Sequence, residues 1–263
     1  MNNSPILFFD SGIGGLPYLE WLKVRMPEES FIYIADNKNF PYGTKSREQL
    51  IDIIHDTMDE AVDKYSPKAS VIACNTASVI SLDHLRSNFD FPFIGVVPAI
   101  KPAAFLSENK KIGLMATNRT IEDKYTEKLI IEHASDCEVF RYAGTEIIDF
   151  IENELSSAKS GERETVIDPA VKFFHEKEVD IVVLGCTHFL LLENELQNAL
   201  GPQIKIIDSR EGVGRQIVRV LKDKDILSAK KQSDLFVLTG QGDEEKKIKN
   251  YRWISKKYGL CAV

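Results

Sequence analysis

The sequence lacks a hydrophobic run long enough to cross a membrane. The uncharged stretch of residues 69–82 contains three serines, an asparagine and a threonine, whereas a transmembrane helix needs about 18 or more apolar residues. The first apolar segment has no basic residue before it and ends at Asp10, which makes it too short for a secretory signal. These absences predict a cytoplasmic protein without membrane contact.

Cysteine is scarce and never closely paired. The four cysteines stand at positions 74, 137, 186 and 261 and form no Cys-x-x-Cys motif. This spacing argues against a zinc ribbon, a dithiol redox protein and a disulfide framework. In a reducing compartment we expect four free thiols and no metal site.

An excess of positive charge is also absent. The 40 acidic and 33 basic side chains leave a formal charge of −7, which argues against a nucleic-acid partner. An apolar share of 43% and a charged share of 28% exclude general disorder. At roughly 100–200 residues per domain, 263 residues correspond to one large domain or two smaller ones.

The chain does contain a regular alternation of short β-rich apolar runs and longer amphipathic segments, as in βα units that build a parallel sheet. Ser46 and Gln49 predict a capping box at the start of a helix that reaches about Tyr65. The basic segment 246–257 favours a solvated helix face over a site for an anionic partner. The predicted strands are Ile6–Phe9, Phe31–Ala35, Ser70–Ala73, Phe93–Val96, Lys111–Met115, Glu138–Arg141, Asp180–Leu184, Lys205–Ile207 and Leu235–Leu238.

The two halves of the chain contain a weak internal repeat. Residues 71–76 resemble residues 183–188, and each segment is an apolar run that ends at a cysteine followed by small polar residues. Residues 6–11 likewise resemble residues 113–118. The repeat predicts two similar α/β domains with one cysteine at a corresponding strand end in each.

The carboxyl ends of the predicted strands carry small polar and ionisable residues. Ligands of parallel sheets bind at these ends, because loops and helix N-termini converge there. If the two sheets face one another, these residues line one cleft. They are Asp10, Ser11, Cys74, Asn75, Thr76, Thr117, Cys186, Thr187 and His188.

A glycine-rich turn, Asp10-Ser11-Gly12-Ile13-Gly14-Gly15, follows the first strand. A dinucleotide fingerprint would require glycine where Pro17 stands. Two interpretations remain. The turn lets the backbone approach a small anion, or it is a tight turn in which Asp10 caps the helix from about Leu16.

Each strand-end cysteine, taken singly, is best explained as a small buried residue. Two thiols on opposite sides of a cleft, however, suit removal of a proton from one face of a carbon and delivery to the other. A thiolate and a thiol coexist near neutral pH when nearby groups lower one pKa from its reference of about 8.5. His188 stands two residues after Cys186, and Asp10 is its counterpart near the other cysteine. The two remaining cysteines lack such a setting.

Five ordered blocks of the sequence resemble the glutamate racemases over nearly the whole chain. The blocks are residues 9–16 (FDSGIGGL), 41–46 (PYGTKS), 73–78 (ACNTAS), 95–102 (GVVPAIKP) and 184–188 (LGCTH). The resemblance implies an α/β fold of two pseudosymmetric domains, each a mainly parallel sheet flanked by helices, with the active site in the interdomain cleft. The implied domains are residues 1–97 with 209–263, and residues 98–208.

The resemblance also implies a cofactor-independent isomerase that interconverts L- and D-glutamate by a two-base transfer between thiols, with D-glutamate supplied for peptidoglycan biosynthesis and cell shape. By match of motif, Cys74 takes the α-proton from D-glutamate and Cys186 takes it from L-glutamate. Asp10 and His188 assist the thiols, and Glu152 orients His188. The implied substrate-binding residues are Asp10, Ser11, Tyr42, Gly43, Asn75, Thr76, Thr117, Thr120, Thr187 and His188.

Some features depart from the family pattern or leave alternatives open. Phe189-Leu190 follow His188 where the family usually has Tyr-Pro, and Pro17-Tyr18 stand where Thr-Val is common, so the helix starts beside the cleft differ. An aspartate or broad-specificity amino-acid racemase would keep both cysteines, whereas a non-catalytic amino-acid-binding protein would leave them unexplained. A homodimer stays open. We expect no activation by a nucleotide precursor, because no extension precedes the first strand.

Overall fold

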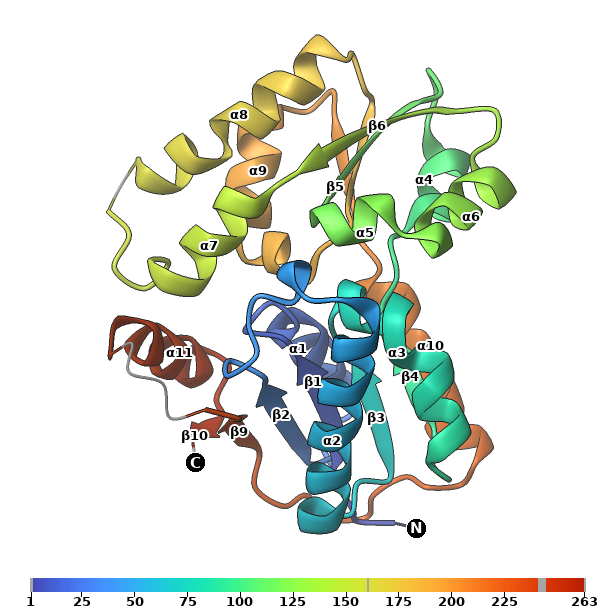
Figure 1. Ribbon diagram of the computed structural model, residues 1–263, viewed down its shortest axis with the longest axis vertical. Helices are drawn as coiled ribbons and strands as arrows, with labels where there is room; N and C mark the ends of the chain where they lie inside the picture. The colour runs from blue at the N-terminus through green and yellow to red at the C-terminus, as the bar shows by residue number, and fades with distance from the viewer. Residues whose placement is uncertain (1, 160, 241–244, 263) are drawn as a thin grey trace. The chain divides into compact units, whose positions relative to one another are not determined.

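The computed structural model describes residues 2–159, 161–240 and 245–262, and the chain divides into two compact units (Figure 1). Unit 1 comprises residues 1–96 and 210–263, and unit 2 comprises residues 97–209. Each unit contains one sheet in which all neighbouring strands are parallel. The predicted α/β class, with parallel sheets flanked by helices, is therefore confirmed.

Unit 1 is built on a sheet of six strands in the order β10-β9-β2-β1-β3-β4. Both central strands, β1 and β2, are buried along their whole length, so apolar residues alternate between the two covered faces. The strands are β1 (Ile6–Asp10), β2 (Phe31–Ala35), β3 (Ala69–Ile72), β4 (Phe93–Gly95), β9 (Leu235–Leu238) and β10 (Cys261–Ala262). Strand β10 was not predicted, because two residues at a sheet edge leave no periodic signal.

Helices cover this sheet on both faces. The predicted capping box at Ser46 and Gln49 is present at the start of α2, which ends at Tyr65 as expected. One face packs on the apolar stripe of α2, and on the other Phe236 lies between Tyr33 and Tyr251 of α11. The helices are α1 (Leu16–Arg25), the short 3-10 turn η1 (Tyr42–Thr44), α2 (Arg47–Tyr65), α3 (Asn75–Asn88), α10 (Arg210–Asp223) and α11 (Glu245–Lys257).

Unit 2 has a sheet of four strands in the order β6-β5-β7-β8. The strands are β5 (Lys111–Ala116), β6 (Glu138–Ala143), β7 (Ile181–Leu184) and β8 (Lys205–Ile207). Its helices are α4 (Ile100–Leu106), α5 (Asn118–Glu122), α6 (Lys124–His133), α7 (Thr145–Asn153), α8 (Glu162–Glu176), the 3-10 helix η2 (Thr187–Leu192) and α9 (Glu193–Leu200). No described helix is long and apolar enough to cross a membrane.

The internal repeat is visible in the strand order, because β2-β1-β3-β4 of unit 1 matches β6-β5-β7-β8 of unit 2. The Ala73 and Gly185 N–H groups donate equivalent bonds of 2.7 Å, to the carbonyls of Phe9 and Met115 respectively. This register makes Cys74 and Cys186 equivalent. The same register aligns residues 6–11 with residues 112–117, one position earlier than the alignment with residues 113–118 by sequence similarity. The two alignments differ because hydrogen bonds define the register and apolar similarity does not.

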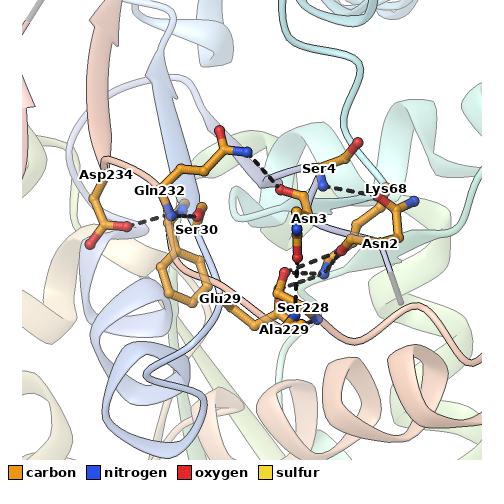
Figure 2. A network of polar contacts seen from close by, with 11 residues as sticks. Asn2, Asn3, Ser4, Glu29, Ser30, Lys68, Ser228, Ala229, Gln232 and Asp234 are labelled. Carbon is orange, nitrogen blue, oxygen red and sulfur yellow. Dashed lines mark hydrogen bonds and ion pairs between the residues drawn. The ribbon is translucent and has the colours of Figure 1, made fainter.

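A polar network closes the amino ends of the unit 1 strands (Figure 2). Lys68 Nζ lies 2.5 Å from Glu29 Oε2, and both side chains are buried. Ser228 donates from its Oγ to the same carboxylate at 2.8 Å, and the backbone carbonyl of Asn2 accepts from Lys68 at 2.8 Å. The network satisfies a buried ion pair and ties the segment before β9 to the start of the chain.

Candidate active site

Cys74 lies at the carboxyl end of β3, as the N-cap of α3. Its Sγ accepts from the Ala77 N–H at 3.5 Å and lies 3.6 Å from the Ser11 hydroxyl. Ser11 in turn donates to Asp10 Oδ1 at 3.2 Å. The three side chains of this hydrogen-bonded series, Asp10, Ser11 and Cys74, are all buried. The predicted association of Asp10 and Ser11 with Cys74 is present in the structure.

The turn after β1 brings these groups together. Gly15 lies against β3 so closely that a Cβ there would sit 2.6 Å from the Ala73 Cβ, so only glycine fits. Gly15 is also the N-cap of α1. The Asp10 carboxylate accepts from the Gly12 N–H at 3.1 Å, within the loop that leads to this helix. The interpretation of Asp10 as a capping group stays a prediction.

Asn75 is the first residue of α3 and is 3% exposed. Neither its amide nitrogen nor its amide oxygen has a hydrogen-bond partner among the described residues. Buried amides are nearly always paired, because an unpaired one costs about 1–3 kcal/mol. The side chain next to Cys74 thus has both a donor and an acceptor available for a ligand.

Tyr42 and Gly43 belong to the turn η1. The Tyr42 hydroxyl donates to Asp36 Oδ2 at 2.6 Å. Burial, the Asp36 carboxylate and the negative charges of Cys74 and Asp10 raise the pKa of Tyr42 well above its usual value. The phenol therefore stays neutral. Gly43 is exposed, with open space where a side chain would be.

Cys186 occupies the equivalent place in unit 2, at the N-cap of η2 after β7. Its Sγ lies 3.6 Å from His188 Nδ1, and His188 Nε2 lies 2.6 Å from Glu152 Oε1 of α7. Both His188 and Glu152 are buried. Burial opposes the charged ring, but the hydrogen bonds to Cys186 and Glu152 and their negative charge outweigh it and raise the pKa of His188 well above its usual value. The structure assembles these three residues as the sequence predicts.

The remaining predicted residues are four threonines, three in unit 2 and one in unit 1. Thr117 is the N-cap of α5, where its Oγ1 accepts from the Thr120 N–H at 3.1 Å and donates to Thr120 Oγ1 at 3.0 Å. Thr187 follows Cys186 and is buried. Thr76 is buried on the unit 1 side, after Asn75. Each of these residues therefore lies at or just after the carboxyl end of a strand.

Sequence reasoning missed Asp36, which is fully buried directly after β2. The rule that led to Asp10, an acidic residue at the end of an apolar strand, applies equally to Phe31–Ala35 and would have found it. The four cysteines are all free thiols, with Cys261 exposed and Cys137 partly exposed. Within the described ranges, no group of three or more His, Cys, Asp and Glu side chains is arranged to hold a metal ion.

The two α/β units share one strand order, and each has a cysteine at the same strand end. The Asp/Glu/Hydantoin racemase family matches residues 19–211. A glutamate racemase of Shewanella sp. (strain MR-7) is 38% identical over 223 residues, which cover 84% of this chain and 80% of the relative. The chain belongs to the Asp/Glu/hydantoin racemase family and, within it, to the glutamate racemases.

Solved structures support the same assignment. The glutamate racemase of Escherichia coli, in complex with L-glutamate and the activator UDP-MurNAc-Ala, has a TM-score of 0.87 at 32% identity and covers 98% of this chain and 97% of its own. The enzyme of Francisella tularensis, in complex with D-glutamate, has a TM-score of 0.78 at 27% identity, with coverages of 98% and 94%. The resemblance read from the five sequence blocks is confirmed.

Proposed function

We propose that this isomerase interconverts L- and D-glutamate by moving the α-proton between Cys74, Cys186 and the substrate carbon. The equivalence of the two cysteines in strand register is the observation that carries the proposal. Residues 1–97 with 209–263 and residues 98–208 act as the two domains, and each domain supplies one of the two thiols. No cofactor takes part in the reaction.

The two directions use the thiols in opposite roles. From L-glutamate, the Cys186 thiolate removes the α-proton, and the Cys74 thiol delivers its proton to the opposite face of the carbanion to give D-glutamate. From D-glutamate, Cys74 is the base and Cys186 is the acid. Each sulfur must approach the α-carbon to about 3–3.5 Å from its own side. During proton transfer the mechanism thus requires a separation of about 7 Å between the two sulfurs, too far for a disulfide.

The polar groups around the thiols have distinct tasks. Glu152 holds the His188 ring against Cys186, and Asp10 assists Cys74 together with Ser11. Because the substrate's own carboxylate opposes carbanion formation, the site must supply donors to the developing charge. The residues that hold the carboxylates and the ammonium group are Asp10, Ser11, Tyr42, Gly43, Asn75, Thr76, Thr117, Thr120, Thr187 and His188.

The relatives crystallised with L-glutamate and D-glutamate support a small amino-acid substrate. A D-glutamate product fits cytoplasmic synthesis of peptidoglycan precursors, with neither nucleic acid nor membrane as a partner. The Escherichia coli enzyme binds an activator, UDP-MurNAc-Ala. Turnover of this chain with and without that compound tests our expectation that none is required, and sedimentation equilibrium tests whether the active form is a homodimer.

Proton NMR in D₂O tests the reaction directly. We expect the purified protein to replace the α-proton of glutamate by deuterium, and the Cys74→Ser/Cys186→Ser double variant to be inactive. The matched control, Cys137→Ser/Cys261→Ser, removes the two thiols outside the site and should exchange at the wild-type rate. Faster exchange with aspartate than with glutamate would point to an aspartate or broad-specificity racemase. Binding of glutamate without any exchange would leave only a binding protein.

A further inference from the structure

A buried carboxylate that the proposed mechanism does not use lies directly after β2. Asp36 is fully buried. It accepts from the Tyr42 hydroxyl at 2.6 Å, from the Thr239 hydroxyl at 2.5 Å, and from Asn39 Nδ2 at 3.0 and 3.1 Å to its two oxygens. A buried carboxylate needs such donors to offset the loss of water. Asp36 therefore joins the turn that carries Tyr42 to the end of β9.

The bond to Asp36 restricts what Tyr42 does. A phenol has a single hydrogen, and in Tyr42 it points to Asp36. Burial and the Asp36 carboxylate raise the pKa of Tyr42, so the hydrogen stays on the oxygen. The hydroxyl is thus not a donor to a substrate carboxylate. Its place in the structure is that of an anchor, which fixes the turn that exposes Gly43.

The C-terminal part of unit 1 contacts the same loop at further points. Asn37 and Gly240 exchange two hydrogen bonds, each of 3.0 Å. The Thr239 hydroxyl also accepts from the Lys38 N–H at 3.3 Å. Lys247 Nζ of α11 lies 4.1 Å from the centroid of the Phe40 ring. Residues some 200 positions away, at the end of β9 and on α11, therefore contact the loop between β2 and α2 at several points.

We propose that Thr239 and Asp36 are positioning residues, which hold the Tyr42–Gly43 turn for the substrate, so that the end of β9 sets the affinity for glutamate. Thr239 orients Asp36, and Asp36 orients Tyr42. The proposal rests on the proposed function, in which that turn contacts the substrate. It goes beyond that function by assigning a binding role to the C-terminal segment and an indirect role to the Tyr42 side chain.

The test compares two hydroxyls of one segment that bond to buried carboxylates at opposite ends of the unit 1 sheet. Thr239→Val removes the bond to Asp36, and Ser228→Ala removes the bond to Glu29 shown in Figure 2. We expect Thr239→Val to raise the KM for glutamate roughly tenfold with little change in kcat. Thr239→Ser, which restores the hydroxyl, should return the KM to the wild-type value. Ser228→Ala should lower the melting temperature without changing the KM.

A second pair of measurements separates this proposal from the racemase proposal. Hydrogen–deuterium exchange of residues 37–45 should become faster in Thr239→Val but not in Ser228→Ala, whether or not glutamate is the substrate. In a Tyr42→Phe background, Thr239→Val should have no further effect on the KM. Three outcomes would each overturn the proposal that Thr239 positions Tyr42 through Asp36. They are equal loop exchange in the two variants, a KM that Thr239→Ser does not restore, and a full effect of Thr239→Val on the KM in the Tyr42→Phe background. If the wild type does not exchange the α-proton of glutamate, the proposed function fails. Hydrogen–deuterium exchange of the loop then tests by itself whether Thr239 and Asp36 hold the Tyr42–Gly43 turn.

Discussion

The surroundings of Cys74 and Cys186 differ although their places in the fold are equivalent. Each cysteine follows the strand that pairs with the first strand of its unit, and each is the N-cap of the next helix. Cys74 contacts a hydroxyl and, through it, a carboxylate. Cys186 instead contacts an imidazole that a buried Glu152 holds in place. The repeated fold therefore supplies position, while the loops supply a different electrostatic environment to each sulfur.

In the proposed mechanism, this difference corresponds to the opposite directions of the two thiols. The raised pKa of His188 makes its ring a positively charged neighbour of Cys186. On the Cys74 side, the Ser11 hydroxyl that lies near the sulfur donates to the Asp10 carboxylate. A racemase needs one base and one acid at the same moment, and exchanges the roles when the direction is reversed. Two unlike surroundings are thus compatible with a reversible reaction on one carbon.

Removal of either thiol should produce the largest effect. Cys74→Ser and Cys186→Ser should each lower racemisation by on the order of 10³-fold or more, because a hydroxyl is a much weaker base than a thiolate. The direction of the remaining half-reaction distinguishes the two. Cys74→Ser should still exchange the α-proton of L-glutamate with D₂O, and Cys186→Ser that of D-glutamate, as followed by NMR. Racemisation at the wild-type rate in either variant would exclude the two-thiol mechanism.

Glu152→Gln should have the next largest effect, and only on the Cys186 side. A hydrogen bond between charged groups contributes about 1.5–3 kcal/mol, which corresponds to about a 10- to 100-fold loss of kcat/KM. Without the carboxylate the pKa of His188 falls, so the alkaline limb of the rate profile should move to lower pH. A pH–rate titration of L-glutamate exchange measures this. An unchanged profile would show that Glu152 does not act through His188.

The same variant should also change how the free energy of unfolding depends on pH. The pKa of His188 is raised in the folded protein, so its contribution to stability is fully present below its unfolded pKa of about 6.5 and is lost as the pH rises through the folded value. In Glu152→Gln this contribution shrinks. Urea unfolding at pH 6 and pH 9 should therefore give a smaller difference for the variant than for the wild type.

Much of this arrangement was predictable from the sequence, because it depends on local patterns. Strand ends followed by polar residues placed Cys74 and Cys186 correctly, and the Ser46 capping box marked the start of α2. The contacts of Asp36 were not predictable, because its partner Thr239 is far away in the sequence and no periodicity records a hydrogen bond.

Asn75 offers a smaller test of the unit 1 side. Its amide has no partner in the described structure, so Asn75→Leu should leave the free energy of unfolding unchanged or increase it, since a buried unpaired amide is unfavourable. The substrate loses one or two hydrogen bonds, and its KM should rise roughly tenfold. Chemical denaturation and steady-state kinetics measure the two effects separately. A clear loss of stability would mean that the amide is satisfied in the free protein.

Ser11→Ala should give the smallest effect and the finest comparison of the two sides. The strand register equates Ser11 with Thr117, yet Ser11 contacts the Cys74 sulfur while the Thr117 hydroxyl caps α5. A neutral hydrogen bond contributes about 1 kcal/mol, so the loss of the bond to Cys74 in Ser11→Ala should slow exchange from D-glutamate about fivefold more than exchange from L-glutamate. Thr117→Val should instead lower stability through loss of the cap, by about 1 kcal/mol. Equal slowing of both enantiomers by Ser11→Ala would show that this hydroxyl acts through substrate binding alone and does not tune Cys74.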